Sequence, residues 1–167
     1  MDPESIYKVP GGTRIGHVHL KVSDLKRSLD FYCGLLGFEL ITTYGSDAAF
    51  ISAGGYHHHI GLNTWHTRNA SPSPVNKTGL YHIAILYPER KDLAVILQRI
   101  MQKRYPIGGA SDHGVSEAIY LEDPDKNGIE LYWDRPKEQW PLKPDGTIDM
   151  FTRQLDLEGL LEEIKKS

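Results

Sequence analysis

Two histidines and one glutamate stand at positions where they could share a metal ion. His17 and His82 each begin a segment in which apolar residues alternate with other residues, and Glu130 lies between Ile129 and Leu131 in a third such segment. Two imidazoles and a carboxylate with open positions beside them suit non-haem Fe²⁺, and Zn²⁺ or Mn²⁺ accept the same ligands. The plainer interpretation is that each histidine is a partly exposed residue of a sheet.

The segments that begin at His17 and His82 are copies of one repeat. Residues 17–24 and 82–89 continue with apolar residues at every second position, which is typical of a strand buried on one face. A helical spacing of apolar residues follows, at 25–36 in the first copy and at 93–101 in the second. The later strand-like segments are 38–44, 48–52 and 56–64 in the first copy, and 118–122 and 128–133 in the second.

We therefore predict an α+β fold built from two βαβββ modules, at about residues 14–64 and 79–134. Residues 65–78 are rich in Pro, Ser and Asn and should form an exposed linker between the modules. Residues 1–134 would make a single domain with a cupped mixed sheet, helices outside and a metal cavity inside. Residues 135–167 would form a C-terminal extension with a short helix that packs on the domain or on a partner.

The alternation within each strand decides which side chains face the hollow of this sheet. The apolar residues of the first strand must face the helix, so His17 faces the hollow. The same argument sends His82, Tyr120 and Glu130 inward from later strands. A carboxylate between two apolar strand residues is costly unless it is paired or binds an ion. The equivalent positions of the two histidines make a metal site the stronger interpretation.

Two further patterns bear on this site. Gly61 is the first-module counterpart of Glu130 and supplies no ligand, so three protein ligands would leave positions open for water or substrate. Residues 123–128 match the first six positions of an EF-hand calcium loop. We reject a calcium site because strands rather than helices flank this segment and Pro124 is unusual there. We expect a tight turn that aims Glu130.

The composition excludes several other classes of protein. The chain has 167 residues, 40% hydrophobic and 25% charged, which is ordinary for a globular domain. Its 19 Lys and Arg against 22 Asp and Glu give a net charge of −3 and no broad basic surface for nucleic acid. The sequence lacks an apolar run of about 20 residues for a membrane helix and the pattern of a signal peptide. The single Cys33 indicates a reducing, cytoplasmic compartment.

Taken together, residues 14–134 resemble the vicinal oxygen chelate superfamily, which includes glyoxalases, bleomycin-resistance proteins and extradiol ring-cleaving dioxygenases. The residues that carry the resemblance are His17, Leu20, Val22, Asp24, Arg27, Ser28, Leu29, Phe31, Tyr32, Leu36, Gly37 and Phe38 in the first module, and His82, Asp123, Pro124, Asn127, Gly128 and Glu130 in the second. Within the superfamily, the chain is most similar to the catechol 2,3-dioxygenase branch.

The resemblance implies a ligand set. Members of that branch hold Fe²⁺ with two histidines and one glutamate, which match His17, His82 and Glu130. Mn²⁺, Zn²⁺ and Ni²⁺ are the alternative metals. A tyrosine ten residues before the glutamate matches Tyr120.

The resemblance also implies catalytic histidines. A His-Gly pair upstream of the tyrosine matches His113 and Gly114 in type, although the gap to the tyrosine is two residues shorter. The acid/base histidine of the branch is matched most nearly by His58. Strand parity instead sends His57 and His59 inward, so His58 and His59 both stay open as the base.

The implied activity is metal-dependent extradiol cleavage of a small catechol-type aromatic with dioxygen. One alternative is a glyoxalase-type lyase or isomerase on Ni²⁺ or Zn²⁺, which normally has a fourth ligand, a carboxylate, near Gly61. The other is a metal-free binding protein of the same fold, which has no use for three aligned ligands. Many ring-cleaving dioxygenases carry two such domains per chain, so the resemblance also favours a homodimer or a role for the extension in closing the pocket.

Overall fold

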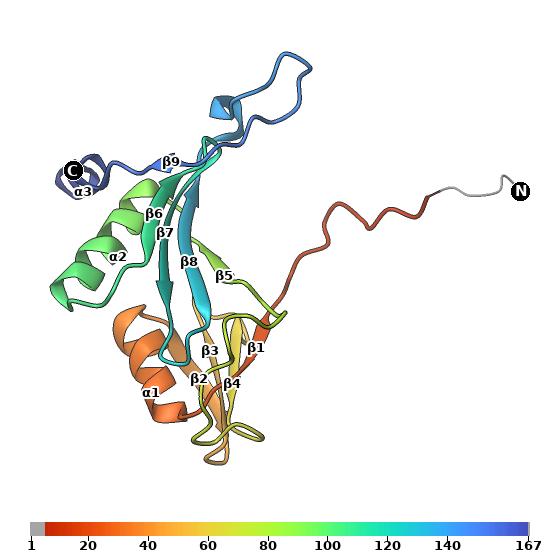
Figure 1. Ribbon diagram of the computed structural model, residues 1–167, viewed down its shortest axis with the longest axis vertical. Coiled ribbons are helices and arrows are strands. Elements are labelled where there is room, and N and C mark those ends of the chain that lie inside the picture. Colours follow the sequence, from red (N-terminus) through yellow and green to blue (C-terminus); the bar gives the residue numbers. More distant parts are fainter. Residues whose placement is uncertain (1–5, 167) are drawn as a thin grey trace, which may run out of the picture.

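The computed structural model describes residues 6–166, which form two mixed β-sheets with both long helical segments on the same side (Figure 1). The first module contains β1 (Val18–Lys21), α1 (Leu25–Leu29) continued by a π-helical turn η1 (Asp30–Leu35), β2 (Glu39–Tyr44), β3 (Ala48–Ser52) and β4 (Ile60–Asn63). Its strand order is β1-β4-β3-β2, and β1 pairs with β4 in parallel. The Asp24 side chain starts α1 by accepting a hydrogen bond from the Arg27 N–H.

The second module repeats this arrangement. It contains β5 (Ile83–Leu86), α2 (Arg90–Gln102), β6 (Gly109–Asp112), β7 (Ser116–Glu122) and β8 (Gly128–Asp134). Its strand order is β5-β8-β7-β6-β9, and β5 pairs with β8 in parallel as β1 does with β4. Glu89 and Asp92 form a reciprocal capping box at the start of α2.

The predicted α+β class and the two βαβββ modules are confirmed, with two differences. The strands form two separate sheets rather than one cupped sheet. The last strand of the first module begins at Ile60 rather than at residue 56, because residues 53–59 form a turn that contains Gly54 and Gly55 at positive φ.

Strand parity is confirmed in both modules. Leu20 and Val22 are buried while His19 and Lys21 are exposed, and Ile129 and Leu131 are buried on either side of Glu130. The buried apolar residues of both modules belong to one core cluster, which also includes residues of the helices. The polar residues that alternate with them therefore lie on the opposite face of each sheet.

The turn between β7 and β8 joins the two modules. The Asp125 carboxylate accepts hydrogen bonds from the Ser23 N–H and hydroxyl, at 3.0 and 2.6 Å, and pairs with Arg27 at 2.6 Å. The Tyr32 hydroxyl donates to Asp123 at 2.9 Å. The segment that resembles a calcium loop is thus a tight turn in which Asp125 binds the start of α1 and Asp123 binds Tyr32 of η1.

The C-terminal extension packs on the second module. It contains η2 (Lys137–Gln139), β9 (Arg153–Gln154), α3 (Leu157–Leu161) and η3 (Glu162–Lys165). β9 adds a strand to the edge of β6, and α3 contacts α2 with Leu160 fully buried. The division of the chain at residue 134 and the linker at 65–78 stay predictions.

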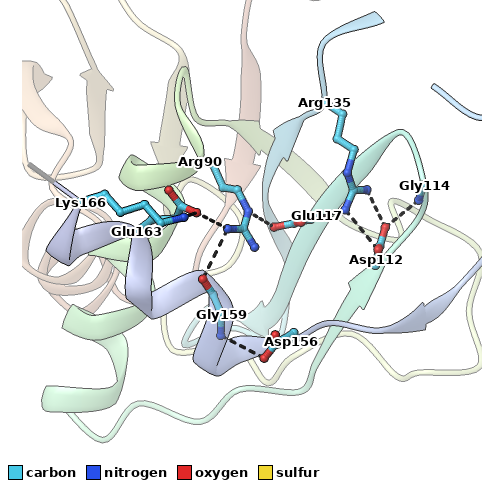
Figure 2. Close-up of polar contacts among 9 residues, drawn as sticks. All are labelled: Arg90, Asp112, Gly114, Glu117, Arg135, Asp156, Gly159, Glu163 and Lys166. Atoms are coloured by element: carbon cyan, nitrogen blue, oxygen red, sulfur yellow. Dashed lines mark hydrogen bonds and ion pairs between the residues drawn. The ribbon is translucent and has the colours of Figure 1, made fainter. Parts of the chain in front are cut away.

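A chain of ion pairs ties the extension to the second sheet (Figure 2). Arg90 on α2 pairs with Glu117 at 2.7 Å and with Glu163 at 2.6 Å. Arg135 pairs with Asp112 at 2.6 Å and with Glu117 at 2.8 Å. The buried Glu117 carboxylate is therefore shared by two guanidinium groups, which compensates for the cost of its burial.

Within residues 6–166, the helices lack the length and apolar composition that a membrane crossing requires.

Candidate metal centre

The second module brings His82 and Glu130 into direct contact. His82 immediately precedes β5, and Glu130 on β8 stands opposite Ala84 on β5. The His82 Nε2 and the Glu130 Oε2 are 2.8 Å apart, and their side chains are 30% and 12% exposed. The parallel pairing of two strands thus presents one imidazole and one carboxylate on the face opposite the core.

Tyr120 and His113 extend this pair into a chain of contacts. The Tyr120 hydroxyl donates to the Glu130 Oε1 at 3.1 Å and lies 2.7 Å from the His113 Nε2. Burial and the neighbouring Glu130 charge raise the pKa of Tyr120 to about 12. Tyr120 therefore keeps its proton at neutral pH and can act as a hydrogen-bond donor.

The other nitrogen of His113 contacts the C-terminal extension. Its Nδ1 lies 3.0 Å from the Phe151 carbonyl oxygen and 3.3 Å from the Thr152 hydroxyl. The sequence analysis did not identify either residue. Every residue has a main-chain carbonyl, so the residue type of Phe151 does not indicate this contact, and Thr152 lies far from His113 in the chain.

His17 lies in a second group of side chains. Its ring stands 4.4 Å from the ring of His58, centroid to centroid. Across residues 6–166, no three His, Cys, Asp or Glu side chains are arranged as a ready group of metal ligands. The structure thus brings together His82, Glu130, Tyr120 and His113, and places His17 against His58.

The turn before β4 carries three consecutive histidines with different surroundings. The His57 and His58 Nδ1 atoms are 2.7 Å apart, so one of them carries the shared proton. Burial, and then the neighbouring His17, lower the pKa of His58. The Nδ1 of His59 lies 2.8 Å from the Ser52 hydroxyl and accepts from the Ala53 N–H at 3.3 Å. Since this turn precedes the strand, strand parity does not govern it.

The first module has no carboxylate where the second has Glu130. Gly61 stands opposite His19 on β1, just as Glu130 stands opposite Ala84 on β5. A Cβ atom at Gly61 would lie 2.9 Å from the Cγ of His19. Any larger residue at this position would collide with the histidine ring, so the position cannot supply a fourth ligand while His19 keeps its place.

The donor chemistry of the His82–Glu130 pair fits a divalent ion. Ligand atoms at right angles around an ion with bonds of about 2.1 Å are about 3 Å apart, close to the observed 2.8 Å. In residues 6–166, the His82 Nδ1 is a buried nitrogen without a hydrogen-bond partner. An unsatisfied buried polar atom costs about 1–3 kcal/mol. The contact with Glu130 therefore leaves one of the two His82 ring nitrogens unsatisfied.

The comparison with known protein families agrees with the fold. The profile described as the Glyoxalase/Bleomycin resistance protein/Dioxygenase superfamily matches residues 14–131. The chain belongs to this superfamily. The C-terminal extension lies outside the matched region.

Two curated relatives narrow the similarity further. The chain is 42% identical over 152 residues to the "Catechol-2,3-dioxygenase" of Bacillus subtilis (strain 168), a match that covers 90% of this chain and 52% of the relative. It is 27% identical over 121 residues to "Biphenyl-2,3-diol 1,2-dioxygenase 2" of Rhodococcus globerulus, with 72% and 63% covered. The chain thus spans about half to two thirds of the length of these relatives.

Solved structures confirm the fold. A glyoxalase/dioxygenase from Nostoc punctiforme has a TM-score of 0.64 and 19% identity, covering 81% of this chain and all of that one. The lactoylglutathione lyase of Agrobacterium tumefaciens has a TM-score of 0.56 and 18% identity, with 75% and 96% covered. At these identities the likeness shows the architecture alone.

Proposed function

We propose that this protein is a metal-dependent extradiol dioxygenase that cleaves the ring of a catechol-type aromatic. The observation that carries the proposal is the continuous chain of contacts from His82 through Glu130 and Tyr120 to His113. The 42% identity to a catechol-2,3-dioxygenase supports it.

His82 and Glu130 hold the metal in this proposal, and His17 is its third ligand. His17 stands immediately before β1 as His82 stands before β5, which makes the two histidines equivalent in the repeat. Fe²⁺ is the metal that suits two histidines, one carboxylate and oxygen chemistry, while Mn²⁺, Zn²⁺ and Ni²⁺ accept the same donors. When bound, the ion supplies the positive charge that favours a deprotonated catechol and an adjacent site for dioxygen.

His58 is the base that takes the phenolic proton. Its lowered pKa keeps it neutral near pH 7, and its ring packs against His17. His59 is less suited because its Nδ1 is held by Ser52 and Ala53. A positioned histidine base commonly contributes about 10²–10⁴-fold to the rate.

Tyr120 and His113 stabilise the negative charge that develops as dioxygen is reduced. The protonated Tyr120 hydroxyl offers a donor at the edge of the Glu130 carboxylate, and His113 supports that hydroxyl from the far side. Donors that are already in place before the reaction stabilise such charge without reorganisation.

The protein is proposed to act as a homodimer in the cytoplasm. All six residues of the edge strand β2 are exposed, including Leu40, Ile41 and Tyr44, so this edge is open to a second copy. The single Cys33 has no partner for a disulfide within the chain, which fits a reducing compartment.

Oxygen-dependent ring opening tests the proposal. The full chain is loaded with Fe²⁺ without air and then mixed with air and a series of catechols. We expect a yellow semialdehyde product and consumption of one dioxygen per ring, and neither signal in chelator-treated protein. Tight iron binding without product from any catechol would contradict the proposal, and turnover of a thiol adduct without oxygen uptake would favour the glyoxalase alternative.

A further inference from the structure

A hairpin of the C-terminal extension, residues 141–152, closes against the turn that carries His113. We call it the strap hairpin. Its two arms pair through Leu142 and Ile148. The Phe151 N–H donates to the His113 carbonyl at 3.3 Å, and the Phe151 carbonyl lies 3.0 Å from the His113 Nδ1. The strap hairpin lies wholly outside the region that the superfamily profile matches.

Close packing at Gly114 shows that this contact is built into the fold. Gly114 is buried at a φ of +78°. A Cβ atom there would lie 2.7 Å from the Phe151 Cε1 and 2.9 Å from the Pro141 Cγ. Both arms of the strap hairpin therefore approach the backbone at a distance that glycine permits and larger residues do not.

The carbonyl at Phe151 decides which nitrogen of His113 carries a proton. A carbonyl oxygen only accepts hydrogen bonds, so the contact at 3.0 Å places the proton on Nδ1. The Thr152 hydroxyl can donate or accept, and it is farther away, at 3.3 Å. In the neutral ring the Nε2 beside Tyr120 is then an acceptor, so the single proton of the Tyr120 hydroxyl is shared between its contacts with Nε2 at 2.7 Å and with Glu130 at 3.1 Å.

We propose that the main-chain carbonyl of Phe151 is a positioning group of the active site: it fixes His113 as the Nδ1–H tautomer and so directs Nε2 toward Tyr120. The proposal rests on the proposed function for the role of His113 in catalysis. It gives the extension a part in the site beyond its packing on α2. A carbonyl or carboxylate that holds the second nitrogen of a functional histidine commonly sets its tautomer in this way.

The tautomer can be observed directly in the metal-free protein. Long-range ¹⁵N–¹H correlation spectra of the labelled full chain, at about pH 8.5 where ordinary histidines are neutral, distinguish Nδ1–H from Nε2–H imidazoles. The spectrum of a His113→Asn variant assigns the His113 signals. We expect the Nδ1–H pattern in the wild-type chain, and an Nε2–H pattern would overturn the proposal without any need for a variant.

Two glycine substitutions then separate the contact from general strain. Gly114→Ala drives a Cβ atom into Phe151 and Pro141, whereas Gly146→Ala creates the same type of backbone strain, at a φ of +81°, with nothing within 4 Å. Gly114→Ala should shift His113 toward the Nε2–H tautomer and lower kcat by about 10-fold, a typical loss for a group that orients a functional side chain. Gly146→Ala should change neither.

The remaining outcomes are also decisive. Thr152→Val should keep the Nδ1–H tautomer, and its loss in that variant would assign the role to the hydroxyl instead. If Gly114→Ala displaces the Phe151 resonances while the tautomer persists, the strap hairpin has only a structural role. Because the tautomer is read without metal or catechol, it stands or fails independently of the dioxygenase activity.

Discussion

The two modules share one topology but differ in the residues on the face of the sheet opposite the core. At equivalent positions of the parallel strand pair, the first module has His19 opposite Gly61 and the second has Ala84 opposite Glu130. In each pair a large residue faces a small one. The large residue lies on the first strand of the module, β1, in the first case and on the last strand, β8, in the second. The repeat thus places His17 and His82 at equivalent positions, just before β1 and β5. At the facing positions the large and the small residue are exchanged between the strands, and we call this the exchange of size. It leaves a carboxylate at this position in the second module alone.

The turns between the last two strands differ in the same way. In the first module this turn, residues 53–59, carries three histidines, of which His58 packs against His17. In the second it carries Asp123 and Asp125, which bind the first helix. One copy of the turn therefore carries the histidine proposed as the base, while the other holds the modules together.

Removing the carboxylate that only the second module has should produce the largest effect. In Glu130→Gln, the proposed metal site loses its carboxylate ligand, and a bound metal ion commonly contributes several kcal/mol of charge stabilisation, or about 10³-fold in rate. We expect metal content to fall to background and ring cleavage to drop by about that factor. Elemental analysis and oxygen uptake measure the two quantities.

The control for this variant is Glu122→Gln, which changes an exposed carboxylate on the adjacent strand β7 that pairs with Lys126 at the surface. It should bind metal and turn over as the wild type does. If Glu130→Gln kept a full complement of metal, the asymmetry between the modules would have nothing to do with metal binding.

The histidine turn of the first module offers the next comparison. His58→Gln should lower kcat by about 10²-fold because it removes the proposed base. His59→Gln should have little effect on kcat, since the His59 ring bonds Ser52 and Ala53 rather than facing His17. Steady-state kinetics with the best catechol measures both, and a larger loss in His59→Gln would exchange their roles.

Local alternation and the repeat were enough to predict the modules, the strand parity and the inward position of Glu130. A period of two leaves no freedom over which residues share a face of a strand. Parity does not apply to His57, His58 and His59 because they lie in a turn, where side-chain direction depends on the particular φ and ψ angles. The sequence also contains no sign that His17 packs against His58, because that contact depends on the parallel pairing of β1 with β4 and on the shape of the turn before β4.

The contact of Phe151 with His113 was out of reach for a different reason. It uses a main-chain carbonyl, which every residue has, and joins segments 38 residues apart. The packing of Gly114 against the strap hairpin leaves only a glycine in the sequence, and a glycine in a turn has many explanations. Long-range main-chain contacts of this kind become visible only in the folded chain.

The aspartate turn of the second module should matter for stability rather than chemistry. In Asp125→Ala, the buried Ser23 N–H and hydroxyl lose their acceptor and Arg27 loses its carboxylate. Unsatisfied buried donors of this kind cost about 3 kcal/mol together. Urea denaturation should show this loss, while Lys126→Ala, which breaks an exposed ion pair in the same turn, should change stability by less than about 1 kcal/mol. Equal losses in the two variants would show that the turn does not join the modules.

The smallest expected effect tests the exchange of size between the modules directly. Gly61→Ala places a Cβ atom 2.9 Å from the His19 ring, and overpacking of this kind costs about 1–2 kcal/mol even though alanine otherwise suits a strand better than glycine. Removing the ring should abolish the cost, so the double variant His19→Ala/Gly61→Ala should be as stable as His19→Ala alone in urea denaturation. The difference between the two backgrounds measures the coupling of the facing positions. If Gly61→Ala reduced stability equally in the wild-type and the His19→Ala background, the first module would exclude a side chain at position 61 for reasons unrelated to His19. The absence of a carboxylate at this position would then not be explained by the large residue at position 19.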